Sequence, residues 1–191
     1  MINKGYLTAK TDKASDEYFT PEFAVLPIIK HLQRFAQKFD RPVTVWCPFD
    51  KETSAFVQVL RQYNYKVLAT HIDSGYNFFD FEPQQYDIII SNPPFSIKDL
   101  ILKRLDELGK PYAMLLPLST LQGVGRFDYI QNCQALIFNK RINFYQDEAQ
   151  TIMAKGVAFA TIYICKNFLN PDGVKWLKRK CRNTATRVSR N

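Results

Sequence analysis

The sequence has 191 residues, of which 46% are hydrophobic and 23% charged, and its formal net charge at pH 7 is +8. These values are typical of a globular domain large enough for a substantial core, and they exclude a disordered chain. No stretch approaches the roughly 20 apolar residues that a membrane-spanning helix requires, and the N-terminus lacks the apolar segment of a signal peptide. We therefore expect a cytoplasmic protein with no membrane partner.

The four cysteines are far apart, without the spacing of a metal site or a redox motif. We expect them to be reduced thiols. Since the chain has only two histidines, we also expect no metal and no histidine-based catalytic triad.

The spacing of apolar residues predicts helices that alternate with strands. Thr20-Pro21 is a favourable helix start, with Thr as N-cap and Pro at the first helical position, and this helix is expected to reach about residue 38. Further helices are predicted from Thr53 or Ser54 to about residue 64, and from Ser96 to about Leu108, where Gly109 closes the helix. Strands are predicted at residues 43–46, 67–72, 78–79, 86–91, 111–116, 135–138 and 156–165.

This alternation predicts an α/β fold, built on a mainly parallel sheet with right-handed crossovers. The C-terminal part of the chain departs from this alternation, because residues 134–145 and 156–165 are strand candidates with no clear helix between them. We expect these two segments to form an antiparallel pair at one edge.

The most informative stretch is Ile88-Ile89-Ile90-Ser91-Asn92-Pro93-Pro94-Phe95. The β-branched run predicts a strand buried on both faces, and the two prolines end it in a stiff loop. Open α/β sheets bind ligands at the carboxyl ends of their strands. The Asn92 side-chain oxygen and the Pro93 carbonyl can accept hydrogen bonds from a planar amine, and Phe95 can stack on the plane that carries it. The alternative is an ordinary strand-to-loop turn.

The Asn92-Pro93-Pro94-Phe95 loop resembles the [Asn/Asp/Ser]-Pro-Pro-aromatic loop of the class I S-adenosylmethionine-dependent methyltransferases, in particular those that methylate the exocyclic amine of adenine. The resemblance covers about residues 16–165. It implies a Rossmann-like sheet of seven strands, mostly parallel with an antiparallel last strand and with helices on both faces. It also implies S-adenosylmethionine as cofactor, DNA in preference to RNA as substrate, and a catalytic role for Asn92, Pro93, Pro94 and Phe95.

The same resemblance implies where the cofactor binds. Thr-Pro before the first helix lies near the methionine part of the cofactor in this family, an acidic residue after the second strand holds the ribose hydroxyls, and an Asp-Phe-Phe-like segment contacts the adenine. The matching positions are Tyr18, Thr20, Pro21, Asp73 with His71 beside it, Asn77 and Phe78, with Asp80 as the alternative to Asn77.

The loop after the first strand departs from the family pattern Asp-Pro-Phe-x-Gly-x-Gly. It reads Cys47-Pro48-Phe49-Asp50-Lys51-Glu52-Thr53-Ser54, so both glycines and the leading acid are absent. Such glycines let the backbone approach a ligand closely. Pro48 and Phe49 remain as candidate cofactor contacts, and Asp50 supplies an acid from a shifted position.

Positive charge is concentrated at the end of the chain. Residues 171–191 hold seven basic residues and one acidic residue, which leaves only +2 for the rest. We therefore divide the chain into a methyltransferase domain, residues 1–170, and a basic C-terminal tail, residues 171–191. Basic side chains around a tryptophan can grip phosphates and stack on a base, while the alternative is a solubilising end. The candidate contacts are Lys175, Trp176, Lys178, Arg179 and Lys180.

Two loops expected at the rim of the catalytic end add further candidate nucleic-acid contacts, namely Arg126 within residues 123–127, and Lys140 with Arg141 within residues 139–143. For Lys140 and Arg141 a solvated turn is the alternative. The chain has no room for a separate recognition domain, which by analogy would suit a compact phage or mobile-element enzyme.

Three functions remain open. The first is methylation of the N6 amine of adenine in DNA, less readily RNA, with the base flipped into the loop. The second is methylation of a protein glutamine amide, because such enzymes use a similar loop. The third is a non-catalytic nucleic-acid-binding protein on the same fold, motivated by the missing glycines.

Overall fold

The computed structural model describes residues 18–147, 149–154, 160–169 and 173–177, and of Lys175 and Trp176 it describes the backbone alone. Its α-helices and 3-10 helices follow the predicted order along the chain. They are α2 (Glu22–Ala36), α3 (Ala55–Gln62), η1 (Ile72–Ser74), η2 (Phe95–Ile97), α4 (Lys98–Leu108), η3 (Leu118–Leu121), η4 (Val124–Arg126) and α5 (Phe127–Ile130).

The described residues form one seven-stranded sheet in the order β2-β1-β3-β4-β6-β5-β7. Strands β2, β1, β3 and β4 pair in parallel, β6 pairs antiparallel with both β4 and β5, and β7 pairs parallel with β5. The strands are β1 (Thr44–Cys47), β2 (Lys66–Ala69), β3 (Ile88–Ser91), β4 (Tyr112–Pro117), β5 (Gln134–Phe138), β6 (Ala160–Lys166) and β7 (Val174–Leu177). The predicted Rossmann-like α/β class, mostly parallel with one antiparallel strand near the end of the chain, is confirmed.

Two details differ from the prediction. Residues 78–79 are not a strand but part of a turn, and Phe78 is only 4% exposed because it fills the space above β1. Strand β7, within the segment predicted as a tail, pairs with β5 and forms the edge, so the antiparallel pair β5–β6 forms as predicted but lies inside the sheet and not at its edge. The basic segment therefore begins inside the sheet, and the antiparallel strand is the sixth of seven.

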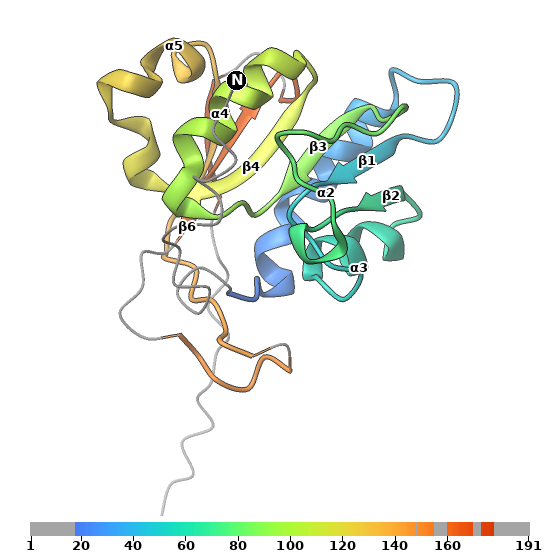
Figure 1. Ribbon diagram of the computed structural model, residues 1–191, viewed down its shortest axis with the longest axis horizontal. Helices are drawn as coiled ribbons and strands as arrows, with labels where there is room; N and C mark the ends of the chain where they lie inside the picture. The colour runs from blue at the N-terminus through green and yellow to red at the C-terminus, as the bar shows by residue number, and fades with distance from the viewer. Residues whose placement is uncertain (1–17, 148, 155–159, 170–172, 178–191) are drawn as a thin grey trace, which may run out of the picture.

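Helices cover both faces of the sheet, as predicted (Figure 1). Successive strand residues alternate between two hydrophobic clusters, because side chains of a strand point to opposite faces. Val45 and Cys47 pack with α2 and α3 on one face, while Trp46 packs on the other face. Leu102 of α4 belongs to the same cluster as Trp46. Burial on both faces explains why these strands read as continuous apolar runs.

Helix ends agree with the local sequence. Pro21 is the N-cap of α2, one position from the prediction, and Thr20 immediately precedes it. Gly109 ends α4 in the left-handed conformation with φ 64°, which glycine adopts without the steric cost of a side chain. The start of α2 and the loop after β3 lie at the same edge of the sheet, where the Asn92 side chain contacts Thr20.

Candidate active site

The loops that follow β1, β2 and β3 meet at one edge of the sheet, because the three strands are parallel neighbours. At this edge β3 ends with Ser91, which is fully buried, and Pro93 behind it is also buried. Phe95 then begins η2, which continues directly into α4. Pro93 and Pro94 thus end the strand at the predicted position. Asn92 lies between the buried strand β3 and the helices that follow.

The Asn92 side chain has one engaged end and one unengaged end. Its Nδ2 donates a hydrogen bond to Thr20 Oγ1 at 3.1 Å. Its Oδ1 is buried, and no described atom donates to it. A buried acceptor without a donor is costly in a folded protein. The site therefore holds an acceptor that a ligand with an N–H group can satisfy.

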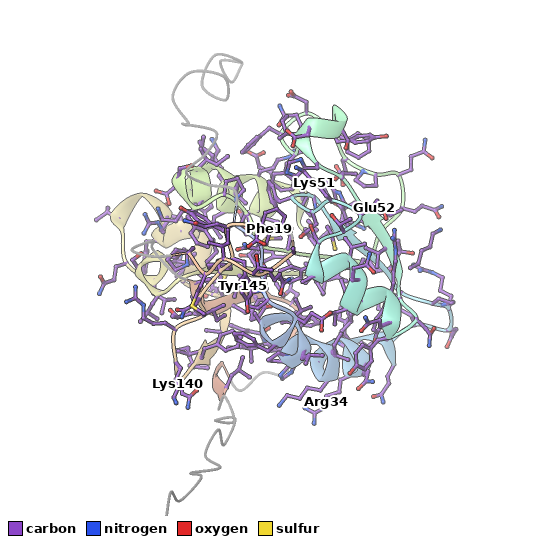
Figure 2. The ribbon with its side chains drawn as sticks, turned by 90° about the horizontal axis from the view of Figure 1, so that it is seen from below. Phe19, Arg34, Lys51, Glu52, Lys140 and Tyr145 are labelled. Atoms are coloured by element: carbon purple, nitrogen blue, oxygen red, sulfur yellow. The ribbon has the colours of Figure 1, made fainter. Side chains whose placement is uncertain are left out.

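Thr20 is 7% exposed and is held from two sides. Its carbonyl accepts a hydrogen bond from Gln150 Nε2 at 3.3 Å. The preceding residue, Phe19, forms a two-way backbone bridge with Tyr145, with N···O distances of 2.9 and 3.0 Å, and the two residues lie together in Figure 2. Tyr18 is half-buried and packs against the core on the α2 face. The segment that carries Tyr145 and Gln150 was not predicted to reach this site.

Phe95 is half-buried and contacts the hydrophobic clusters of both faces. Its ring meets Phe144 edge-on, with ring centroids 6.1 Å apart. Phe144 is a residue that the sequence analysis missed, although its buried neighbour Ile142 makes an alternating apolar pattern that could have placed it against the sheet. The Phe95 ring is thus braced along one edge.

The glycine-free loop after β1 turns its acid inward. Asp50 is 5% exposed, and Ser91 Oγ donates a hydrogen bond to Asp50 Oδ2. Burial raises the pKa of Asp50 to about 7, while hydrogen bonds from Ser91 and Ser54 act in the opposite direction. Burial also raises the pKa of the adjacent Cys47 thiol. The loop is therefore tied to the end of β3 by a buried carboxyl group whose pKa is raised.

Asp73 lies beside the same loop, at the end of β2. Its carboxylate is half-exposed and forms an ion pair with Lys51, with Nζ and Oδ2 2.9 Å apart. His71 Nδ1 lies 3.4 Å from the same oxygen and accepts a hydrogen bond from the backbone N–H of Asp73. The ion pair thus brings Asp73 together with the loop after β1.

Asn77 and Phe78, the implied adenine contacts, lie in the turn that follows η1. Asn77 Nδ2 donates to Asp80 Oδ2 at 2.8 Å, and Asn77 Oδ1 accepts from the Phe79 N–H at 3.1 Å. The Phe78 ring packs against Phe49, with centroids 4.9 Å apart. Asn77 therefore stabilises a turn with both ends of its amide, and Phe78 belongs to the core.

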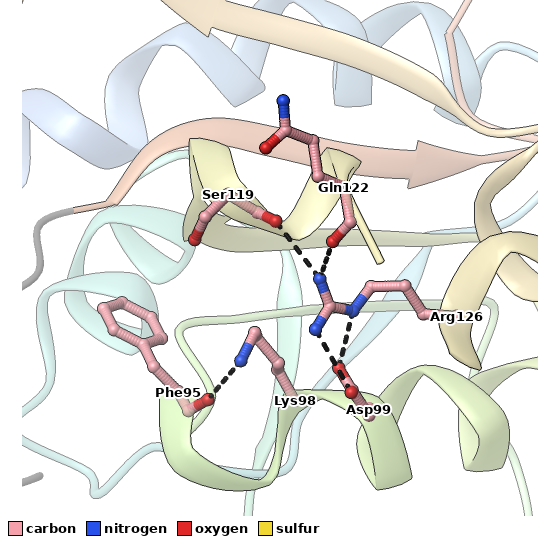
Figure 3. Close-up of polar contacts among 6 residues, drawn as sticks. All are labelled: Phe95, Lys98, Asp99, Ser119, Gln122 and Arg126. Carbon is pink, nitrogen blue, oxygen red and sulfur yellow. Dashed lines mark hydrogen bonds and ion pairs between the residues drawn. The ribbon is translucent and has the colours of Figure 1, made fainter. Parts of the chain in front are cut away.

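Arg126 is held by hydrogen bonds to α4 and to the loop after β4 (Figure 3). Its guanidinium forms hydrogen bonds to both carboxylate oxygens of Asp99, at 2.7 and 3.2 Å, and to the carbonyls of Ser119 and Gln122. Because these contacts use its donors, Arg126 fixes the loop after β4 to α4 and is poorly placed to grip a phosphate. The sequence shows the charge of Arg126 but not its partner 27 residues away.

The remaining predicted nucleic-acid contacts fall in three places. Lys140 and Arg141 are exposed in a bend after β5, and Figure 2 shows Lys140 at the rim of the molecule, away from Lys51. Lys175 and Trp176 belong to β7. Residues 178–180 lie outside the described part of the chain.

Other features of the described residues lie away from this edge of the sheet. A hollow of about 650 Å³ lies at the opposite ends of the strands, lined among others by Arg41, Lys66 and Lys110. Within the described ranges, no group of three or more His, Cys, Asp or Glu side chains could hold a metal ion, and no helix there is long and apolar enough to cross a membrane. Of the cysteines, Cys47, Cys133 and Cys165 are free thiols.

The fold is that of a Rossmann-like α/β protein in which the loops at the carboxyl ends of β1, β2 and β3 meet at one edge of the sheet. No protein-family model matches the sequence, and no curated protein matches it. A similar solved structure is that of a Listeria monocytogenes protein, described provisionally as a class I S-adenosylmethionine-dependent methyltransferase. It is 13% identical, with a TM-score of 0.46, and the match covers 90% of this chain and 68% of that chain.

Proposed function

We propose that the protein is an S-adenosylmethionine-dependent methyltransferase that acts on the exocyclic N6 amine of adenine in DNA. The observation that carries the proposal is Asn92 Oδ1, a buried acceptor to which no described atom donates, at the carboxyl end of a buried strand. An exocyclic amine provides the missing donor. The Pro93-Pro94 exit and the resemblance of the loop to those of amine methyltransferases support the same assignment.

The chain's own residues supply positioning and charge stabilisation. Asn92 Oδ1 accepts a hydrogen bond from the amine and stabilises the positive charge that develops on nitrogen as the new N–CH₃ bond forms. Phe95, braced by Phe144, stacks on the base. S-adenosylmethionine, when bound, supplies the electrophilic methyl group. No protein nucleophile is required, so most of the rate enhancement comes from holding the amine in line.

The residues that would hold the cofactor fit it in part. The Asp73 carboxylate can accept hydrogen bonds from two ribose hydroxyls, and its pair with Lys51 is half-exposed and therefore weak enough to be exchanged. Phe49, in the same loop as Lys51, is half-buried. Asn77 makes one hydrogen bond at each end of its amide, which leaves one N–H and one lone pair for an adenine contact. Asp50 would act indirectly by fixing the loop to Ser91.

A decisive experiment compares methyl transfer from labelled cofactor to duplex DNA, RNA and proteins with exposed glutamines. Asn92→Ala should abolish transfer while cofactor affinity, measured by calorimetry, stays nearly unchanged. Gln62→Ala removes an exposed amide from the end of α3 and is the matched control. Retained turnover in Asn92→Ala would contradict the role given to Asn92.

The outcome also separates the competing functions. Transfer to glutamine amides but not to adenine would show that the substrate is a protein amide, and the role proposed for Asn92 would stand. Absence of cofactor binding at millimolar concentration would favour the non-catalytic alternative.

The proposed DNA contact by the basic segment is tested by ending the chain after Leu177, because this truncation removes the last basic residues and leaves β7 in place. DNA affinity should fall and depend less steeply on salt. Unchanged DNA binding would refute the contact.

A further inference from the structure

The loop after β4, residues 118–127, begins beside the loop that carries Asn92. Strand β4 is the parallel neighbour of β3, and the two strands are paired up to Ser91 and Met114. Strand β4 then continues to Pro117, so at about 3.3 Å per residue it extends roughly 10 Å past the end of β3. The loop after β4 therefore starts beyond the strand end from which Asn92 emerges, at the same edge of the sheet.

Arg126 fixes this loop to α4. Its guanidinium donates hydrogen bonds to Asp99, in the first turn of α4, and to the carbonyls of Ser119 and Gln122 within the loop (Figure 3). Gly123 makes room for the guanidinium, because a Cβ atom at this position would lie 2.7 Å from Arg126 Nη1. Contacts inside the protein therefore hold the loop in one shape.

The fixed loop carries four exposed apolar side chains at intervals of three residues, namely Leu118, Leu121, Val124 and Phe127. Residues three apart lie on the same face of a 3-10 turn, and both η3 and η4 belong to this loop. Val124 is the extreme case, because it is 96% exposed. Clustered apolar side chains on a surface mark an interaction site. The contacts of Arg126 therefore hold an apolar surface in place for a ligand from outside.

Gly125, next to Val124, is not required by packing or by backbone conformation. Its φ is not positive, and a Cβ atom added there would meet no described atom within 4 Å. Glycine loses more conformational freedom on folding than alanine does, and it is favoured where a ligand approaches the backbone closely. Gly123-Val124-Gly125 is therefore a narrow tip with a single apolar side chain. Such a tip suits a gap between stacked planes, whereas protein partners are usually anchored by large aromatic or Arg side chains.

We propose that the tip Gly123-Val124-Gly125 enters the base stack of duplex DNA, where Val124 fills the gap left by the adenine that turns toward Asn92. This inference rests on the proposed function. A paired adenine must leave its stack to reach a site such as that of Asn92, and this step costs free energy. Apolar side chains inserted between base steps offset such costs in DNA-binding proteins. The contacts of Arg126 keep the tip from folding back during insertion.

The first test needs no methyl transfer. The probes are two pools of mixed-sequence duplexes that are identical except for a single abasic site, where the gap already exists. The natural protein should bind the abasic pool about tenfold more tightly, because no base has to be unpaired. Val124→Ser and Gly125→Ala should reduce this preference to less than about twofold. Val174→Ser is the matched control and should keep the preference, because Val174 is 58% exposed but lies on β7.

Methyl transfer provides the second test. Genomic DNA is offered as duplex and as denatured single strands, whose bases need not leave a paired stack. Val124→Ser should lower the single-turnover rate about tenfold on duplex DNA and less than about twofold on single strands. Cofactor affinity should stay unchanged. In urea, Gly125→Ala should be at least as stable as the natural protein, which separates a blocked approach of DNA from a folding defect.

The outcomes separate this inference from the proposed function. If adenine is methylated but Val124→Ser loses rate equally on both forms of DNA, or keeps the abasic preference, the inference is overturned and the function stands. An abasic preference that depends on Val124, without any methyl transfer, would leave the inference standing while the proposed function fails. Absence of the preference in the natural protein would overturn the inference. Self-association that Val124→Ser removes would also overturn it, in favour of a second copy of the chain covering the tip.

Discussion

Replacing Asp50 by Asn should stabilise the protein at neutral and alkaline pH. Asp50 is 5% exposed, and burial, the dominant influence, raises its pKa from 3.8 to about 7. Ser91 and Ser54 lower the pKa through hydrogen bonds but do not offset the burial. Asn has nearly the same shape and keeps an oxygen that can accept from Ser91 Oγ, while it removes the ionisable group.

The sign of the effect follows from proton binding. Below about pH 3.8 the carboxyl group is protonated in both states, so it costs nothing. Between that pH and about 7 the unfolded chain releases the proton while the folded protein keeps it, so the free energy of unfolding falls as pH rises. A shift of about three pKa units, at roughly 1.4 kcal/mol each, gives a loss of about 4 kcal/mol that is complete above the folded pKa.

Urea denaturation of the natural protein and Asp50→Asn, at intervals from about pH 4 to pH 8.5, measures this directly. The two free energies of unfolding should nearly coincide at the acidic end. The variant should then gain relative to the natural protein as pH rises, by about 2–4 kcal/mol at pH 8. A difference that stays constant over the whole range would refute the raised pKa of Asp50 and the burial that causes it.

Two further changes probe the frame around the site. Asp87→Asn should show the opposite pH dependence, because Arg41 donates hydrogen bonds to Asp87 at 2.9 and 2.6 Å and lowers the pKa of its carboxyl group. In urea denaturation at pH 7 the free energy of unfolding of the variant should be about 1–2 kcal/mol lower, a loss kept small by solvent screening at the exposed Arg41. This loss should disappear as pH falls through the lowered pKa of Asp87. A deficit that persists in acid would contradict the ion pair as its cause. Thr70→Val should cost about 1–3 kcal/mol of unfolding free energy, because the fully buried Trp46 loses the acceptor of its indole N–H at 2.8 Å. Thr70→Ser is the control, and equal stability of Thr70→Val and Thr70→Ser in urea would show that the indole needs no hydroxyl.

The parts of the fold that could be predicted are those whose signal is local. The β-branched run before Asn92 required a buried strand, and Gly109 marked the end of α4. The predicted short strand at residues 78–79 was wrong. Two adjacent aromatic residues have high strand propensity, but here they lie in a turn from which the Phe78 side chain is buried in the core. The strand β7 was missed because its four residues stand at the start of a basic run, whose charge suggested a solvated end.

The site divides in the same way. The position of Asn92 at a strand end followed from the pattern of residues, and its neighbours did not. The contact with Thr20 spans 72 residues and the contact of Ser91 with Asp50 spans 41. Both depend on how helices and loops return to one edge of the sheet. Arg126 illustrates the limit most clearly, since a basic residue in a loop is expected to face solvent until its acidic partner on another helix is located.

The glycine-free loop after β1 acquires a physical explanation from the two neighbouring side chains Asp50 and Lys51. Glycines would let a ligand approach bare backbone, whereas here Asp50 turns inward to Ser91 and Lys51 turns outward to Asp73. Asp50 cannot leave without exposing a buried carboxyl group and breaking the tie to β3. Lys51 can leave easily, because its ion pair with Asp73 is half-exposed on both sides and surface pairs of this kind contribute little. Access to the Asp73 carboxylate therefore depends in part on the side chain of Lys51, and the glycine-free loop leaves in place the acceptor that the ribose of the proposed cofactor would use.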